Sequence, residues 1–270
     1  MPLGSNRWGK SEVRVSKVYR GEDADDFSDV TVQVLLEGQV AAAHTHGDNS
    51  AVLPTDTMRN TIYGMAQDHL TKDLERFAVS LCQRFLARSE VHKAEVTLRE
   101  RIWERVSPTG FLGGGSVMRS ATVMRGHEES TRAGIEGLVV LKTRDSAFEG
   151  FPRDEFTILD ETTDRVLATS VTAGWTYAEM PADTSARWAL VRTTLVDCFF
   201  AEWSASVQHQ GYLMGEAVLD AVPEIAEISL RLPNQHHLPF DLTRFGMEWH
   251  GTVFHPVSEP YGDIYLTVTR

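Results

Sequence analysis

Two histidine pairs are the first short patterns in this 270-residue chain whose residue types could take part in chemistry. His44 and His46 would point to the same face of an extended chain, as two ligands of a metal site can. No nearby Cys, Asp or Glu pattern completes such a site, so we interpret them as solvated polar residues. His236 and His237 differ, because they end an apolar alternating strand, where side chains are often placed to act. A single histidine at such a place is still more often structural than catalytic.

The glycine triplet Gly113-Gly114-Gly115 is a second candidate, because glycine-rich loops can cradle phosphate. It lacks the Lys-Ser/Thr of a P-loop and precedes no predicted helix. We therefore predict that the triplet, with Ser107–Gly110, forms a hairpin loop. The chain also has no Gly-x-Ser-x-Gly elbow and no nicotinamide, flavin or haem motif. The short motifs alone identify no reaction.

The elements that must position these side chains follow the order strands, helices, strands. Valines alternating with polar residues predict strands at 12–18 and 30–36. Apolar spacing predicts helices at 57–67 and 71–88, and Thr55 or Asp56 should cap the first of them. Strands at 94–99 and 116–125 complete this half. The second half repeats the order, with strands at 137–142 and 165–177, helices at 183–204 and 208–221, and strands at 228–232 and 264–269. Gly211 and Gly215 should weaken its last helix.

The boundary between the halves falls near Gly134, which divides the chain into domains 1–133 and 134–270. An antiparallel sheet with its helices on one face leaves the other face and its edges uncovered. Barrel closure by several subunits would cover both. We therefore expect an oligomer on physical grounds alone.

Charge and cysteine content restrict the function classes. The formal net charge of −12 opposes binding to nucleic acid and to anionic membranes. An anionic substrate would need a local Arg or Lys. Cys82 and Cys198 are expected to be buried free thiols, which suits a reducing cytosol. With no signal peptide and no apolar run long enough to span a bilayer, we predict a cytoplasmic protein.

Longer blocks of sequence are more specific. They comprise Leu35–Gly38, Gly47–Ser50, Pro54–Thr57, Asn60–Tyr63, Gly137–Lys142, Ser146–Asp154, Asp164–Thr169 and Leu232–His237. Together they resemble the urate oxidase (uricase) family. The blocks run in family order from Trp8-Gly9-Lys10 to Pro260-Tyr261-Gly262, so the resemblance covers essentially the whole chain.

The resemblance implies an α+β fold of two tandem tunnelling-fold units, each with the order ββααββ. Their antiparallel sheets would close into a β-barrel by oligomerisation, giving a homotetramer with active sites at dimer interfaces. The implied partners are urate and O2. The implied reaction of purine catabolism converts urate, O2 and water to 5-hydroxyisourate and hydrogen peroxide, without metal or organic cofactor.

The resemblance also implies the substrate-binding residues. Phe148 is similar to the family's stacking ring, and a flat purine favours an aromatic face. Arg165 is similar to the guanidinium that pairs with urate, and its planar fork suits a delocalised anion. Val207 would contribute its backbone amide, and Gln208 would bond to a neighbouring carbonyl and N–H of the ring. Asp56, with Thr55, would present backbone amides at a helix N-terminus to the far edge of the ring.

The catalytic residues implied by the resemblance are Lys10, Thr55 and His236, a proton relay that prepares urate to give an electron to oxygen. Asn234 would hold oxygen, and later water, above the ring. By resemblance, Lys10, Thr55 and Asp56 come from one chain and the other site residues from its two-fold partner. Taken singly, each residue has an ordinary structural interpretation, such as a surface charge or a helix cap. Their joint occurrence at the family positions favours function.

Three alternatives remain open. A non-catalytic purine-binding protein would keep Phe148, Arg165 and Gln208 but would not need the relay. A pterin-acting enzyme of the same fold would need a zinc cluster that we cannot assemble, and a structural barrel would need none of these polar residues. The chain also departs from the family at Trp8, where Tyr is common, and at Gln235, where Lys is frequent.

Overall fold

The computed structural model describes residues 1–270, which divide into two compact units. The first unit comprises residues 1–135 and 175–188, and the second comprises residues 136–174 and 189–270. Each unit combines antiparallel strands with helices, so the predicted α+β class is confirmed. Each predicted strand and helix is present, with ends that differ by up to seven residues, and the structure adds a short α-helix and two short strands that the sequence did not predict.

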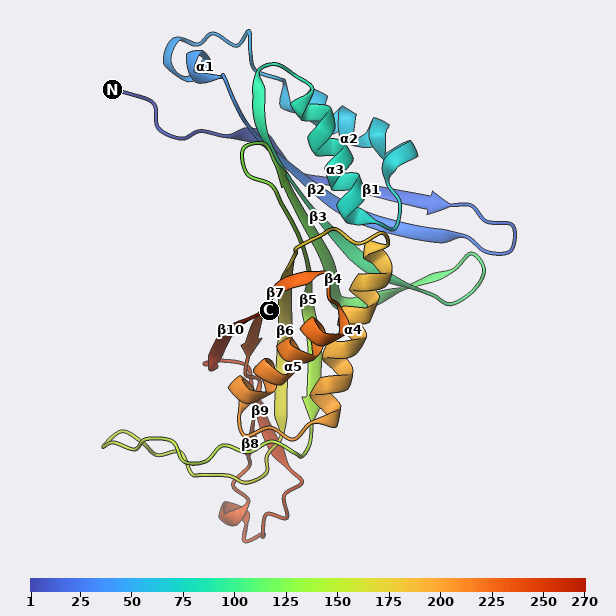
Figure 1. The fold of residues 1–270 in the computed structure, drawn as a ribbon. Coiled ribbons are helices and arrows are strands. Elements are labelled where there is room, and N and C mark those ends of the chain that lie inside the picture. Colours follow the sequence, from blue (N-terminus) through green and yellow to red (C-terminus); the bar gives the residue numbers. More distant parts are fainter. The chain divides into compact units, whose positions relative to one another are not determined.

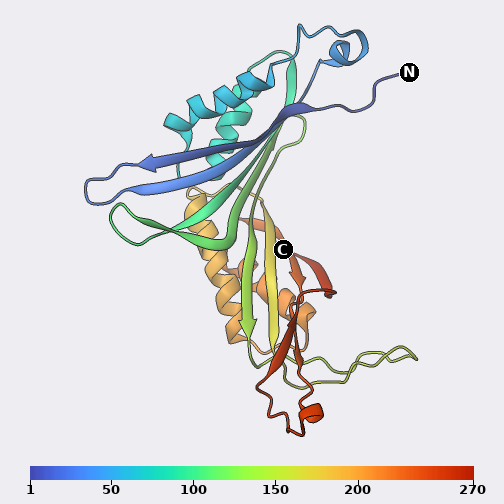
Figure 2. The same cartoon turned by 180° about the vertical axis from the view of Figure 1, so that it is seen from behind.

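The first unit builds its sheet in the order β1-β2-β3-β4, with antiparallel pairing. Its elements are β1 (Trp8–Tyr19), β2 (Asp26–Gly38), α1 (Ala41–His46), α2 (Thr55–His69), α3 (Leu74–Leu86), β3 (Val91–Arg105) and β4 (Phe111–Arg125). Helices α2 and α3 lie on one face of these strands, and the other face carries no helix (Figures 1 and 2). The alternation of valine with polar residues in β2 explains this layering, because Val30, Val32 and Val34 all point into the fully buried core under the helices.

The second unit repeats the scheme with the order β5-β6-β7-β10. Its elements are β5 (Ser130–Lys142), which begins in the first unit, β6 (Leu167–Tyr177), which ends in the first unit, α4 (Thr184–Ala201), which begins in the first unit, α5 (Val207–Ala221), β7 (Ile225–Pro233) and β10 (Asp263–Thr269). A separate two-stranded sheet joins β8 (His236–Pro239) to β9 (Phe254–Val257), with the short 3-10 helix Thr243–Phe245 between them. A long loop, 143–166, connects β5 to β6 and extends away from the strands (Figure 1).

Edge strand β1 contains an irregularity. Lys10 pairs with Val34 and Val13 pairs with Val32, so the two residues between Lys10 and Val13 stand opposite the single residue Gln33. One of the two, Glu12, lies in the left-handed region at φ 56°, which is uncommon for a residue with a side chain. Such a bulge bends the strand and changes the direction of the side chains beside it. It lies next to Lys10, one of the predicted site residues.

Three local predictions were wrong. Gly113–Gly115 lie within β4 rather than in a loop, because the turn is made by the shorter stretch 106–110. A register shift between Arg101 and Trp103, with Gly115 at φ 76°, marks a bulge that glycine can accommodate. His44 and His46 lie in helix α1, not on an extended chain; the helix ends at Gly47, which is left-handed at φ 71°. His236 opens strand β8 instead of ending β7.

Gly211 and Gly215 allow α5 to pack closely on β7 and β10. A Cβ at Gly211 would lie 2.7 Å from methyl groups of Leu232 and Leu266, and one at Gly215 would lie 2.6 Å from a methyl group of Val268. These distances are too short for unperturbed packing. The helix therefore forms in spite of its two glycines, because they let it bury against the strands.

We expect Gly215→Ala to lower the free energy of unfolding by about 1–3 kcal/mol, because the added methyl group overpacks the contact with Val268. Gly64→Ala is the matched control. Gly64 also lies inside a helix, α2, but a Cβ added there would meet nothing within 4 Å. That change should stabilise the protein by up to about 1 kcal/mol through helix propensity. Urea unfolding of both variants measures the difference, and equal effects would contradict the packing role of Gly215.

Candidate active site

Thr55 and Asp56 form the first turn of α2, which follows Pro54 as the capping residue. No side chain caps this end, so the prediction that Thr55 or Asp56 acts as N-cap was wrong. The first bond of the helix runs from the Met58 amide to the Pro54 carbonyl, 3.2 Å away. The amides of the exposed Thr55 and Asp56 therefore have no acceptor within the helix. An uncapped helix N-terminus of this kind favours a partner that accepts hydrogen bonds.

Lys10 lies half-buried in β1, on the first unit with Thr55 and Asp56. The indole N–H of Trp8, two residues earlier, donates to the carbonyl of Leu53 over 3.2 Å. This bond ties the start of β1 to the segment that leads into α2. Trp8 therefore has a structural role that the sequence did not reveal.

Phe148 and Arg165 lie together in the second unit. The guanidinium carbon of Arg165 is 5.4 Å from the centroid of the Phe148 ring. The main chain holds both residues, because Phe148 exchanges two hydrogen bonds with Thr162 and the Arg165 amide donates to Ser146 over 2.8 Å. Phe151, which sequence reasoning missed, stacks on Phe148 at 4.9 Å between ring centroids. Its place in the block Ser146–Asp154 was the only signal for it.

The Arg165 side chain carries a hydrogen-bond donor that has no acceptor in the chain. Its Nε is buried and has no acceptor within the chain. Burial lowers the pKa of Arg165. A buried N–H without a partner in the chain is costly, and this donor is available to an acceptor that enters the site.

The start of α5 presents Val207 and Gln208. Ser206 caps this helix, and its hydroxyl accepts from the His209 amide over 3.0 Å. Val207 is buried and Gln208 is exposed, so the carboxamide of Gln208 is accessible for binding. Just before the helix, Ser204 bonds to Asp145 and Ala147, which brings the α5 N-terminus next to the segment carrying Phe148.

Asn234 and His236 follow β7 and line a hollow of about 590 Å³ with Arg231, His237, Pro256 and Tyr261. The side-chain amide nitrogen of Asn234, Nδ2, lies 3.3 Å from Nδ1 of His236. The main chain here is held by two hydrogen bonds of 2.8 Å. The backbone N–H of Asn234 donates to the carbonyl of Gly262, and the backbone N–H of Gln235 donates to the carbonyl of Ala168. Burial lowers the pKa of His236, and the positive charge of Arg165 lowers it further.

The predicted residues thus fall into two groups. Lys10, Thr55 and Asp56 belong to the first unit, and Phe148, Arg165, Val207, Gln208, Asn234 and His236 to the second. Within the second unit, direct contacts join Phe148 to Arg165 and Asn234 to His236, and the charge of Arg165 acts on His236. This group combines an aromatic face, a cation with an unmet donor, an amide and a half-buried imidazole. It can bind a flat anionic ring and exchange a proton with it.

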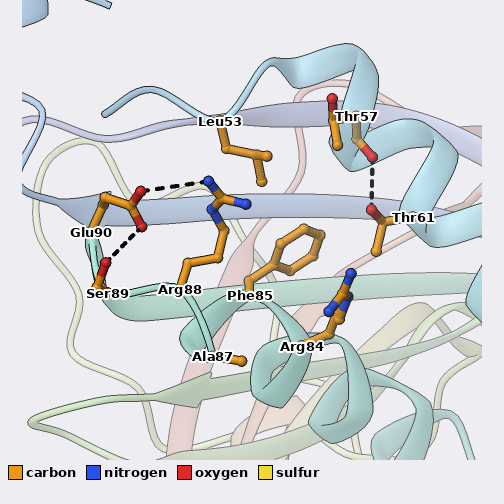
Figure 3. Close-up of a pocket in the computed structure, with 9 residues that line it drawn as sticks. All are labelled: Leu53, Thr57, Thr61, Arg84, Phe85, Ala87, Arg88, Ser89 and Glu90. Atoms are coloured by element: carbon orange, nitrogen blue, oxygen red, sulfur yellow. Dashed lines mark hydrogen bonds and ion pairs between the residues drawn. The ribbon is translucent and has the colours of Figure 1, made fainter. Parts of the chain in front are cut away.

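A second hollow, of about 390 Å³, lies in the first unit (Figure 3). It is lined by Leu53, Thr57, Thr61, Arg84, Phe85, Ala87, Arg88, Ser89 and Glu90. Thr61 donates to the Thr57 carbonyl, and Arg88 pairs with Glu90 at 3.6 Å. The hollow contains none of the predicted site residues.

Two further observations concern partners. No three His, Cys, Asp or Glu side chains are grouped in a way that could hold a metal ion. No helix combines the length and apolar character needed to cross a membrane.

Comparisons with known proteins agree with the predicted family. The family model Uricase matches residues 6–131 and again 131–265. The chain is 40% identical to the uricase of Arthrobacter globiformis, covering 99% of this chain and 90% of that protein, and 40% identical to the uricase of Dictyostelium discoideum, covering 99% and 97%.

Solved structures show the same relationship. The crystal structure of the Arthrobacter globiformis uricase matches with a TM-score of 0.96 at 40% identity, covering 100% of this chain and 95% of that one. A urate oxidase from Bacillus sp. TB-90 matches at 22% identity with a TM-score of 0.85, covering 98% and 100%, which supports the fold. The chain belongs to the uricase family.

Proposed function

We propose that this protein is a urate oxidase, which converts urate, O2 and water to 5-hydroxyisourate and hydrogen peroxide. The observation that carries the proposal is the buried Nε of Arg165, a donor without an acceptor in the chain, beside the Phe148 ring. Urate offers both a flat π-system and acceptor atoms on its edge. The family membership supports the same assignment.

In this proposal, Phe148 stacks on the purine and Arg165 donates to its edge. The guanidinium compensates the urate charge locally, which the chain needs because its net charge is −12. Val207 contributes its backbone amide and Gln208 its carboxamide. The uncapped amides of Thr55 and Asp56 bind the opposite edge of the ring.

The proton transfers are assigned to Lys10, Thr55 and His236, and Asn234 holds first oxygen and then water. Loss of a proton makes urate easier to oxidise, and the electron pair it gives up reduces O2 to peroxide. Water then adds to the oxidised ring, which gives 5-hydroxyisourate. The lowered pKa of His236 keeps its imidazole neutral at neutral pH, so that it can accept a proton.

We propose a homotetramer in which the first-unit group of one chain and the second-unit group of its two-fold partner form each site. Barrel closure would cover the helix-free faces and the edges of the strands. The loop 143–166 supports this proposal, because Phe156 and Ile158 are 82% and 95% exposed on it, and apolar side chains so exposed indicate an interface. We also propose that the chain consists of two tandem tunnelling-fold units, residues 1–133 and 134–270, and that the protein is cytoplasmic, in keeping with its free Cys82 and Cys198.

The proposed reaction needs no metal or organic cofactor. The test is the loss of urate absorbance with stoichiometric release of peroxide, measured after exhaustive treatment with a chelator. Full activity after chelation is the expected result. Activity that disappears and returns with added metal would contradict the cofactor-free mechanism. Urate binding without turnover would favour the purine-binding alternative, and turnover of a pterin in place of urate would favour the pterin-acting one.

The pH profile of kcat/KM should show an acid limb that belongs to His236. Its pKa is lowered from the ordinary 6.5, so the neutral imidazole persists below pH 6.5 and activity falls only as the pH drops through that lowered pKa. His237→Gln is the matched control and should keep the limb. His236→Gln should lower the rate and remove it. An acid limb unchanged in His236→Gln would exclude this histidine as the titrating group.

A further inference from the structure

Lys142, at the end of β5, is a buried cation that the proposed reaction does not use. Its Nζ donates to the Glu202 carbonyl over 2.6 Å and to Oε1 of Gln210 over 2.7 Å. It also lies 5.4 Å from the centroid of the Phe199 ring. Both hydrogen-bond acceptors are neutral oxygens. Burial lowers the pKa of Lys142, against the raising effect of the nearby Asp145, so the charge is held here at a cost in desolvation.

The contacts of Lys142 join two helices. Gln210 is buried in the first turn of α5, and its Nε2 donates to the Cys198 carbonyl, 3.4 Å away in the last turn of α4. Glu202 directly follows α4. Lys142 and Gln210 therefore satisfy carbonyls at the end of α4 and fix where α5 begins.

The turn between these helices is hydrogen-bonded to the segment that carries Phe148. The Ser204 amide donates to the Asp145 carbonyl over 3.1 Å, and the Ala147 amide donates to the Ser204 carbonyl over 2.9 Å. Ala147 precedes Phe148 in the chain, and the carbonyl of Ser146 accepts from the amide of Arg165. The same short turn is thus bonded to the segment that carries the stacking ring and its cation.

We propose that Lys142 is a positioning residue that fixes the α4–α5 turn and thereby sets the first turn of α5 against Phe148 and Arg165. It touches no substrate. Without it, Val207 and Gln208 would lose their fixed distance from the stacking ring, and a shift of about 1 Å in such contacts is enough to weaken binding and catalysis strongly. This inference rests on the proposed function.

The test measures urate affinity at equilibrium without O2, so that no turnover occurs. We expect Lys142→Met, which keeps the apolar stem, to raise the Kd for urate about tenfold. Lys17→Met is the matched control. Lys17 also donates to carbonyls at a helix end, those of Ala66, Gln67 and Leu70, but at the C-terminal end of α2, about 20 Å along the helix from Thr55. It should lose stability in the same way and keep the wild-type Kd.

A second pair of variants applies if Lys142→Met does not fold. Both Gln210 variants lose the Nε2 donor to the Cys198 carbonyl, so they differ in the acceptor for Lys142. Gln210→Glu keeps that acceptor and should bind urate more tightly than Gln210→Leu, which removes it. A folded Lys142→Met with wild-type affinity, or equal affinities for the two Gln210 variants, would overturn the positioning role. A wild-type protein that neither binds nor oxidises urate would instead overturn the proposed function.

Discussion

Mixing a Lys10→Ala chain with an Arg165→Ala chain should restore activity that neither variant has alone. In the proposed dimer, one of the two sites of a mixed pair takes Lys10 from the Arg165→Ala chain and Arg165 from the Lys10→Ala chain. That site is wild type, and its twin carries both lesions, because two-fold symmetry forces this pairing. With equal random mixing, each half of a site is intact about half of the time, so about a quarter of the sites should recover. Activity per subunit of purified, co-expressed oligomer measures it.

A second mixture sharpens this test. Wild-type chains mixed equally with a Lys10→Ala/Arg165→Ala chain should keep about a quarter of the sites if each site is shared, but about half if each site lies within one chain. A mixture of the single variants that stays inactive, although mixed oligomers are shown to form, would place the whole site within one chain.

Arg119→Met should produce the largest loss of stability. Arg119 on β4 donates to Oε2 of Glu75 on α3 over 2.8 Å, and their side chains are only 3% and 0% exposed. Arg119 also donates to the Lys72 carbonyl over 2.9 Å. Removing the cation leaves the Glu75 carboxylate buried without its counter-charge. The expected loss is about 3–5 kcal/mol in the free energy of unfolding.

The control for Arg119 is an exposed pair on the neighbouring strand. Arg99 on β3 pairs with Glu12 at an N–O distance of 2.9 Å, close to that of the buried pair, but the side chains of Arg99 and Glu12 are 45% and 71% exposed. Arg99→Met should therefore cost less than about 1 kcal/mol. Adding Glu75→Leu to Arg119→Met should recover part of the loss, because the Glu75 charge is then removed while the buried Glu100, whose pKa burial raises and Arg119 lowers, still lacks the guanidinium. Urea unfolding at one fixed protein concentration compares the variants, and equal losses for Arg119→Met and Arg99→Met would contradict the argument.

The regular elements could be predicted from the sequence because their patterns are local. The valines of β2 alternate with period two and point to the core, as the pattern requires. The errors lie where a distant contact decides the local structure. Gly113–Gly115 have the composition of a loop but extend β4, because β3 continues beside them. Gly211 and Gly215 weaken an isolated helix but suit one packed on Leu232 and Val268.

The site was predicted from the family resemblance, since single residues such as Lys10 or Val207 carry no signal of their own. The sequence did not predict the contacts that hold these residues in place. The uncapped start of α2 depends on the backbone of Pro54, which differs from the side-chain cap that composition suggested. Phe151 acts through packing on a neighbouring ring, and Lys142 acts through hydrogen bonds to residues 60 and 68 positions away. Contacts of these kinds leave no periodic pattern in the sequence.

The irregular start of β1 has a consequence for how the chain behaves at the open edge of its sheet. An open edge of twelve residues would ordinarily template the stacking of identical strands into fibrils. The bulge between Lys10 and Val13, with Glu12 turned left-handed, interrupts the row of backbone donors and acceptors that such stacking requires. The bulge therefore protects this open edge against runaway strand addition.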